Sequence, residues 1–122
     1  MAEGLVHALG AFAATTRSAG LEPHLVQDAT ERVLDLVGNA LAATGEDPSA
    51  ITLAVTREAG GVPQATVFGQ TERLPASNAA LVNGTLAHAL DFDDTHLPSV
   101  LHPSASIIPA ALAAAEAEGA SG

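Results

Sequence analysis

The sequence predicts a mainly α-helical fold with one small β-hairpin. Hydrophobic residues make up 48% of the 122 residues, yet only 2% are aromatic and alanine is by far the commonest residue. The apolar surface must therefore come from small side chains on closely packed helices. Apolar residues also recur at three- and four-residue spacing in several segments, as on one helix face. A chain of this length predicts a single domain over residues 1–122.

Two amphipathic helices are predicted first. Residues 3–17 carry an apolar stripe, and Gly20 is the expected stop. A second helix is expected to begin near Pro23, which suits a first turn, and to end at Gly45. The two stripes consist of Leu5, Val6, Leu9, Phe12 and Ala13, and of Leu25, Val26, Ala29, Val33, Val37, Ala40 and Leu41.

The next two segments are short. Residues 49–58 leave helix and strand open, because alternate residues are apolar as in a strand. Residues 65–68 and 71–74, separated by Gly69-Gln70, predict a small β-hairpin near 65–74.

A third long helix is expected from about Asn78 to Leu90, after Pro75 and Ser77. It is rich in small residues that permit close approach by a neighbour, and we expect it to be buried. These residues are Ala79, Ala80, Gly84, Ala87 and Ala89.

Residues 91–105 predict a loop or a broken helix, followed by an alanine-rich helix that ends near Glu118. With Ser106 as the N-cap, Pro109 would occupy the third helical position, where no intrahelical N–H bond is lost. An earlier start would require a kink. In either case His102 and Ser104 lie near a helix N-terminus, which favours an anion.

The charge and the cysteine count exclude several functions. The net charge is −10, with four arginines and no lysine, so we expect no binding to nucleic acid. The absence of cysteine excludes disulfides and thiolate nucleophiles. The most apolar run, residues 107–115, is interrupted by Pro109 and is too short to cross a bilayer. With no signal sequence visible, we expect a cytoplasmic protein that does not bind membranes.

The polar segment between Asn83 and Ser104 is the candidate site. It contains three aspartates, three histidines and four hydroxyl side chains, among them Thr95 and Ser104, in a short span. A calcium loop is excluded by spacing, because His96 and His102 stand where the turn glycine and the bidentate glutamate belong. No histidine pair has the zinc-protease spacing, so we expect no metal and no cofactor.

Spacing alone leaves the role of this segment open. If the helix from Asn78 continued through Thr95, Asp91 and Thr95 would share a face and His102 could be returned to them by the loop. The alternative is a solvated acidic helix end with a capping histidine. His88 is expected to be a hydrogen-bonded core histidine. Ser104 is expected to be a cap and not a nucleophile, since it lies in no Gly-x-Ser-x-Gly turn.

The segment resembles the MmgE/PrpD family of 2-methylcitrate dehydratases and cis-aconitate decarboxylases. The shared series is Asn-Gly, His-x-Leu-Asp-Phe-x-Asp-Thr and His-Pro-Ser, found here at residues 83–84, 88–95 and 102–104. The resemblance extends to both flanks but covers only the opening part of a family member. It implies the N-terminal portion of an all-helical domain, truncated here, in a protein that forms homodimers.

The resemblance also implies a reaction and a site. The reaction is that of a metal-independent lyase resembling 2-methylcitrate dehydratase, which transfers a proton next to a carboxylate of a small di- or tricarboxylate. The site residues carried over are Asp91, Thr95 and His102. His102 would exchange the proton or bind the substrate carboxylate, since histidine titrates near neutral pH. Asp91 would orient an imidazole or a substrate hydroxyl, and Thr95 would donate a hydrogen bond.

Two alternatives remain. One is an epimerase of the same family with an iminodisuccinate-like substrate. The other is a non-catalytic helical fragment that self-associates through its alanine-rich faces. A polycarboxylate needs fixed cations that this chain hardly possesses, so we expect those cations to come from other parts of the enzyme.

Overall fold

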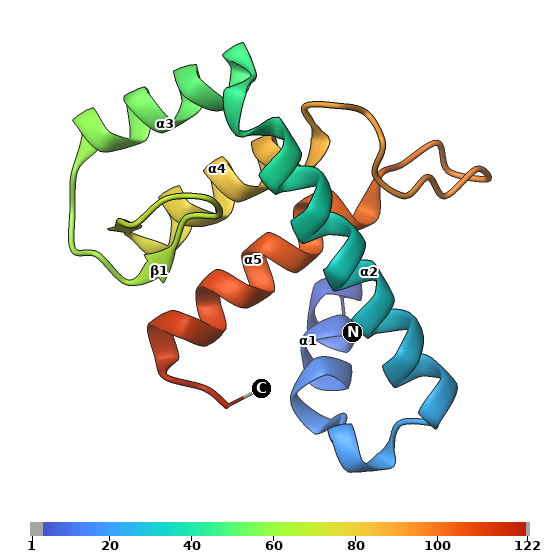
Figure 1. The fold of residues 1–122 in the computed structure, drawn as a ribbon. Coiled ribbons are helices and arrows are strands. Elements are labelled where there is room, and N and C mark those ends of the chain that lie inside the picture. The colour runs from blue at the N-terminus through green and yellow to red at the C-terminus, as the bar shows by residue number, and fades with distance from the viewer. Residues whose placement is uncertain (1–3, 122) are drawn as a thin grey trace. The chain divides into compact units, whose positions relative to one another are not determined.

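The computed structural model describes residues 4–121, which divide into two compact units at Thr30 and Glu31 (Figure 1). The first unit contains α1, Leu5–Thr15, the short 3₁₀ helix η1, Ser18–Gly20, and the opening turns of α2, Pro23–Ala42. The first predicted helix is thus confirmed, but it ends five residues before Gly20, and residue 3 lies outside the described part. Its apolar stripe is exposed, with no buried residue in α1.

The second unit begins within α2 and continues through η2, Ala43–Gly45, into α3, Asp47–Ala59. The predicted second helix is confirmed, with its last turn tightened to 3₁₀ geometry. Residues 49–58, for which the sequence left helix and strand open, are helical and belong to α3. Pro48 at the helix start favours it, because a proline there loses no intrahelical bond, and Gly60 with φ of 64° ends it.

The predicted hairpin is confirmed and is very short. β1, Ala65–Thr66, pairs antiparallel with β2, Arg73–Leu74. A side chain of α4, Ala76–His88, fixes this hairpin to the helices. The Asn83 amide donates to the carbonyl of Thr66 and accepts from the N–H of Phe68, both at 2.9 Å. The asparagine of the Asn-Gly pair is therefore a buried structural residue.

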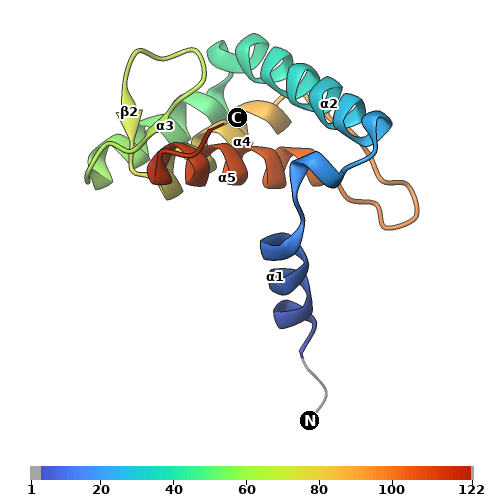
Figure 2. The ribbon, with the colours of Figure 1, turned by 90° about the horizontal axis from the view of Figure 1, so that it is seen from below.

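Helices α4 and α5, Pro103–Glu118, lie side by side and form the main helix pair of the second unit (Figures 1 and 2). Gly84 makes their closest approach possible. A Cβ atom at this position would stand 2.9 Å from the Ala105 carbonyl oxygen of α5. The predicted close approach of another helix to α4 is confirmed, and it is possible because Gly84 has no side chain.

The last helix takes the earlier of the two starts that the sequence left open, so residues 103–105 are helical and not loop. It begins at Pro103 and not after Ser106, so Pro109 lies inside the helix, where it is buried. A proline at position 109 cannot donate to the Ala105 carbonyl, one turn earlier. That carbonyl instead faces Gly84 of α4, at the place where any other residue would carry its Cβ atom. The close contact with α4 thus accompanies the internal proline.

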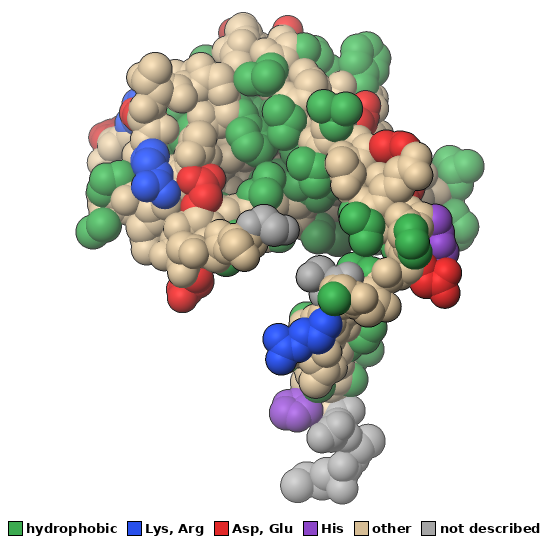
Figure 3. Space-filling view, turned by 60° about the horizontal axis from the view of Figure 1, so that its bottom comes forward, with side chains coloured by type: hydrophobic (Ala, Val, Ile, Leu, Met, Phe, Trp, Pro, Cys, Tyr) green, Lys and Arg blue, Asp and Glu red, His purple; other side chains and the backbone are tan. Residues whose placement is uncertain are grey.

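The core of the second unit consists mainly of small and branched side chains. Alanines contribute to the α4 and α5 contacts, and larger residues come from α2, α3, the hairpin and α4 itself. The buried hydrophobic residues are Leu36, Ala40, Ala43, Leu53, Ala65, Val67, Leu74, Ala79, Val82, Leu86, Ala87, Ala105 and Ala113. Hydrophobic side chains are also numerous on the surface shown in Figure 3. Within residues 4–121, no helix has the length and apolarity needed to cross a membrane.

Candidate functional site

The candidate site begins where α4 ends. The helix stops at His88, and Asp91 adopts a left-handed conformation with φ of 56° while its N–H donates to the His88 carbonyl at 2.9 Å. Aspartate tolerates this conformation better than most residues. Residues 91–95 are therefore not helical, and the premise that Asp91 and Thr95 share a helix face is wrong.

A closed loop then returns the chain to α4. The N–H of His96 donates to the Leu101 carbonyl at 2.8 Å, which joins the two ends of residues 96–101. Inside the loop, Val100 has φ of 53°, a conformation that is strained for a β-branched residue. The His96 ring contacts the Ser99 hydroxyl at 2.6 Å. This closure places His102, the residue before α5, beside the end of α4.

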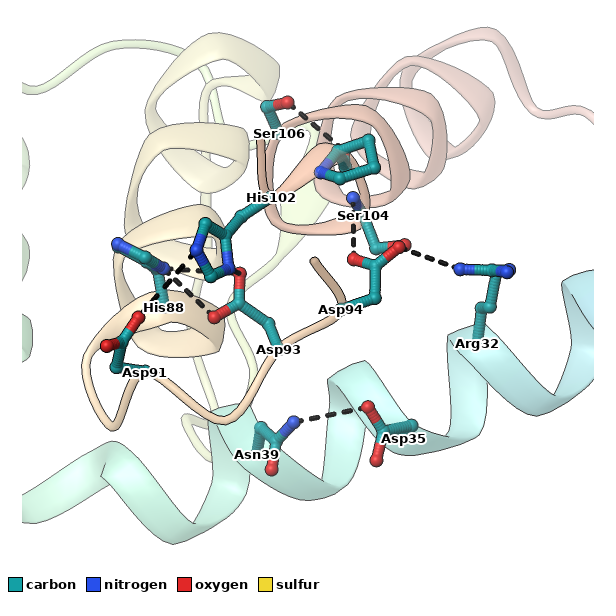
Figure 4. A network of polar contacts seen from close by, with 11 residues as sticks. Arg32, Asp35, Asn39, His88, Asp91, Asp93, Asp94, His102, Ser104 and Ser106 are labelled. Carbon is teal, nitrogen blue, oxygen red and sulfur yellow. Dashed lines mark hydrogen bonds and ion pairs between the residues drawn. The ribbon is translucent and has the colours of Figure 1, made fainter. Parts of the chain in front are cut away.

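Asp93 is the centre of the polar cluster (Figure 4). Its side chain is only 1% exposed and its oxygens lie 3.0 and 3.2 Å from Nδ1 of His88. Its Oδ2 also lies 3.4 Å from Nδ1 of His102. The two imidazole rings meet edge to face, with centroids 4.9 Å apart. One buried carboxylate thus faces two histidines from different elements.

The two predicted site residues Asp91 and His102 come together in space. The Oδ1 atom of Asp91 lies 3.9 Å from Nε2 of His102, and the Asp91 side chain is 78% exposed. Thr95 is exposed, and no hydrogen bond of its hydroxyl is found among the described residues. His88 is hydrogen-bonded as expected, but it is not a core residue, because half of its side chain is exposed.

The expected anion at the helix N-terminus is supplied by the chain itself. Oδ1 of Asp94 accepts the N–H of Ser104 at 3.1 Å, in the first turn of α5. Its Oδ2 pairs with Arg32 at 2.7 Å (Figure 4). Asp94 therefore caps this helix from a distance and helps to explain why α5 begins at Pro103. The N-cap residue of α5 is His102 and not Ser104, which lies inside the first turn, so the expected serine cap is wrong.

An open groove of about 1010 Å³ adjoins the cluster. His88, Asp91 and His102 line its polar end, and most of the remaining lining is apolar and comes from α4, α5 and the 96–101 loop. Asp93 lies behind these residues, outside the lining. The groove therefore offers an imidazole and a carboxylate at one end of an apolar surface, the usual composition of a small-molecule site.

No arginine is among the residues that line the groove. Arg57 pairs with Glu72, and that hydrogen bond raises the pKa of the Arg57 guanidinium. Arg73 pairs with Glu116 of α5 at 3.3 Å, and Arg32 is occupied by Asp94. These three arginines therefore stabilise contacts between elements.

Metal-binding groups also meet in this cluster. Ligand atoms of His88, Asp91, Asp93 and His102 all lie within 4.8 Å of one another. The donors are of the kind that hold zinc or similar ions. However, Nδ1 of His88 and Nδ1 of His102 both face the Asp93 carboxylate, an arrangement that suits hydrogen bonds from the two imidazoles to this carboxylate. The expectation that the protein uses no metal therefore stays a prediction.

Two members of the cluster, His88 and Asp93, were absent from the site predicted by sequence. Spacing could not single out Asp93 among three neighbouring aspartates, because its role depends on burial. The only signal was its place between two motif residues, Asp91 and Thr95. His88 lies on a helix of small residues, which predicts a hydrogen-bonded core histidine, and no local pattern shows that the helix ends at this residue.

Comparison with known proteins assigns the family. The MmgE/PrpD N-terminal domain model matches residues 7–122. The chain is 35% identical over 98 residues to the human (Homo sapiens) cis-aconitate decarboxylase, and 32% identical over 94 residues to the mouse (Mus musculus) enzyme. These matches cover 80% and 76% of this chain but only 20% and 19% of the relatives. The chain thus spans about a fifth of their length, and it belongs to the MmgE/PrpD family.

Proposed function

We propose that this chain forms one wall of the active site of a lyase that acts on a small di- or tricarboxylate without a metal. Proton transfer takes place next to a substrate carboxylate. The observation that carries the proposal is the pairing of Asp91 with His102 at the polar end of the groove. The family membership supports it, since the two relatives are named for decarboxylating cis-aconitate.

The roles follow from position. Nε2 of His102 is the ring nitrogen on the Asp91 side, and it exchanges the proton at the substrate carbon. Asp91 is exposed at the same end of the groove and orients a substrate hydroxyl, because an unprotonated Nε2 offers it no hydrogen to accept. Thr95 remains the proposed hydrogen-bond donor to substrate. Its exposed position leaves its hydroxyl accessible.

The wall is chemically incomplete. A polycarboxylate carries several negative charges, and its specific binding requires cations or several N–H donors. The residues lining the groove include two histidines and no arginine. We propose that the remaining cations come from parts of the enzyme beyond these 122 residues, since the match covers only 20% of the human relative.

The test uses the full-length protein that contains this chain, assayed with cis-aconitate, 2-methylcitrate and iminodisuccinate. The names of the relatives favour decarboxylation of cis-aconitate over dehydration of 2-methylcitrate, the reaction first expected from the sequence motif. Epimerisation of iminodisuccinate is the third possible outcome. We expect His102→Ala to reduce turnover by about 10²-fold or more, because an acid–base group contributes about this much.

A matched histidine serves as the control. His96 belongs to the same loop, and its ring contacts Ser99 and not the cluster. His96→Ala should retain most of the turnover. No turnover of any of the three substrates by the unaltered enzyme, or full turnover by His102→Ala, would overturn the proposal. The predicted homodimer is tested separately by light scattering on the same full-length protein.

A further inference from the structure

Asp93 has a position that the proposed reaction does not yet explain. Its carboxylate is almost fully buried, at 1% side-chain exposure, behind the groove and not in it. Burying a carboxylate is costly unless N–H groups satisfy it. The groups it faces are the Nδ1 atoms of His88 and His102, at 3.0 and 3.4 Å. Packing alone does not explain why a carboxylate, and not an apolar side chain, occupies this buried place.

The chemistry of the pair fixes where the imidazole protons lie. A carboxylate only accepts hydrogen bonds, whereas each nitrogen of a neutral imidazole either donates or accepts. If Nδ1 of His102 carried its lone pair, two acceptors would face each other at 3.4 Å in a buried place. With a proton on Nδ1, the same approach is attractive. The same argument applies to His88, which lies nearer still.

The Nδ1 atom of His102 is buried and, among the described residues, has no properly aligned hydrogen-bond partner. Buried polar atoms without a partner are rare and call for an explanation. Oδ2 of Asp93 lies 3.4 Å from this Nδ1 atom, and hydrogen bonds in catalytic sites are often long until substrate binds. His88 holds Asp93 in place from the other side.

We propose that Asp93 is the positioning residue that holds His102 with its proton on Nδ1, so that Nε2 keeps its lone pair for the substrate proton. This inference rests on the proposed function for its catalytic meaning. Nε2 lies on the Asp91 side, and both Asp91 and His102 line the groove (Figure 4). In the opposite tautomer, Nε2 of His102 would carry a proton and could not accept one from the substrate. Asp93 therefore acts through His102 and does not touch the substrate.

The first test is spectroscopic and needs no variant. Long-range ¹H–¹⁵N correlation spectra of the 122-residue chain, recorded at alkaline pH where imidazoles are neutral, distinguish a protonated ring nitrogen from one with a lone pair. We expect His102 to carry its proton on Nδ1, and His88 likewise. A His102 ring protonated mainly on Nε2 would overturn the inference.

The second test compares two neighbouring substitutions of the same chemical type. Asp93→Asn presents an amide that can donate, so His102 should lose its single tautomer. Asp94→Asn alters the carboxylate that caps α5, and it should leave the His102 tautomer unchanged. Equal spectra for His102 in both variants would contradict the assignment. If Asp93→Asn fails to fold, the unaltered chain still decides the question.

In the full-length enzyme we expect Asp93→Asn to lower kcat by roughly 10²-fold with little change in KM, because the substrate contacts remain while the base is misprotonated. An unchanged kcat would remove Asp93 from the mechanism. This outcome differs from failure of the proposed function, in which the unaltered enzyme would turn over none of the polycarboxylates. The tautomer of His102 is measured without any turnover assay, so it does not depend on either of these outcomes.

Discussion

The contact between Gly84 and α5 gives the sharpest stability prediction, because a methyl group has no room there. In Gly84→Ala the new Cβ would lie 2.9 Å from the Ala105 carbonyl oxygen, against 3.4 Å for ordinary van der Waals contact. Helices α4 and α5 must then separate by about half an ångström. Overpacking of this kind costs about 1–3 kcal/mol.

A second glycine supplies the matched control. Gly38 lies inside α2 and is exposed, and a Cβ added there would have no neighbouring atom within 4 Å. Replacing a helical glycine by alanine stabilises by about 1 kcal/mol from backbone propensity alone. We therefore expect Gly38→Ala to raise the free energy of unfolding by about that amount. Gly84→Ala receives the same gain, so the difference between the two variants isolates the overpacking cost.

The assay is urea unfolding of the chain, followed by far-ultraviolet circular dichroism as the helix signal. We expect the midpoint of Gly38→Ala to exceed that of the unaltered chain, and Gly84→Ala to lie about 1–3 kcal/mol below Gly38→Ala. If both variants gained stability equally, the helices would not meet at Gly84. The close contact between the Ala105 carbonyl and α4 would then be refuted as well.

Four further outcomes follow from single contacts. Asn83→Asp should destabilise the chain by about 2–4 kcal/mol in urea unfolding, because a carboxylate cannot donate to the Thr66 carbonyl; unchanged stability would refute the anchoring role. Asp94→Ala should cost about 1–2 kcal/mol through the lost helix cap, and Arg32→Ala less than about 1 kcal/mol, since that pair is partly exposed; the reverse order would contradict capping. Val100→Asn should raise thermal stability by about 1 kcal/mol, because asparagine tolerates a positive φ, and a lower melting temperature would count against strain in this loop. Dialysis of the full-length enzyme against a chelator should leave its turnover unchanged, and activity restored only by added metal would show that the histidine and aspartate cluster holds an ion.

Much of the fold could be predicted from the sequence, since helices and hairpins depend on local patterns. The two long helices and the 65–74 hairpin were confirmed because apolar periodicity, proline and glycine act within a few residues. The sequence left two starts open for α5, and the choice between them depends on a non-local contact. The cap that allows the helix to begin at Pro103 comes from Asp94, which precedes it by nine residues across a loop.

The sequence by itself determined the family and the set of candidate residues, because a motif lists its chemical groups in order. It could not determine that Asp91 leaves the helix, that Thr95 stays exposed, or that Asp93 becomes buried between two histidines. Those facts depend on how the 96–101 loop closes and on how closely α4 meets α5 at Gly84. Burial and the distance between separate elements arise only from tertiary packing, and they decide which carboxylate faces His102 from behind.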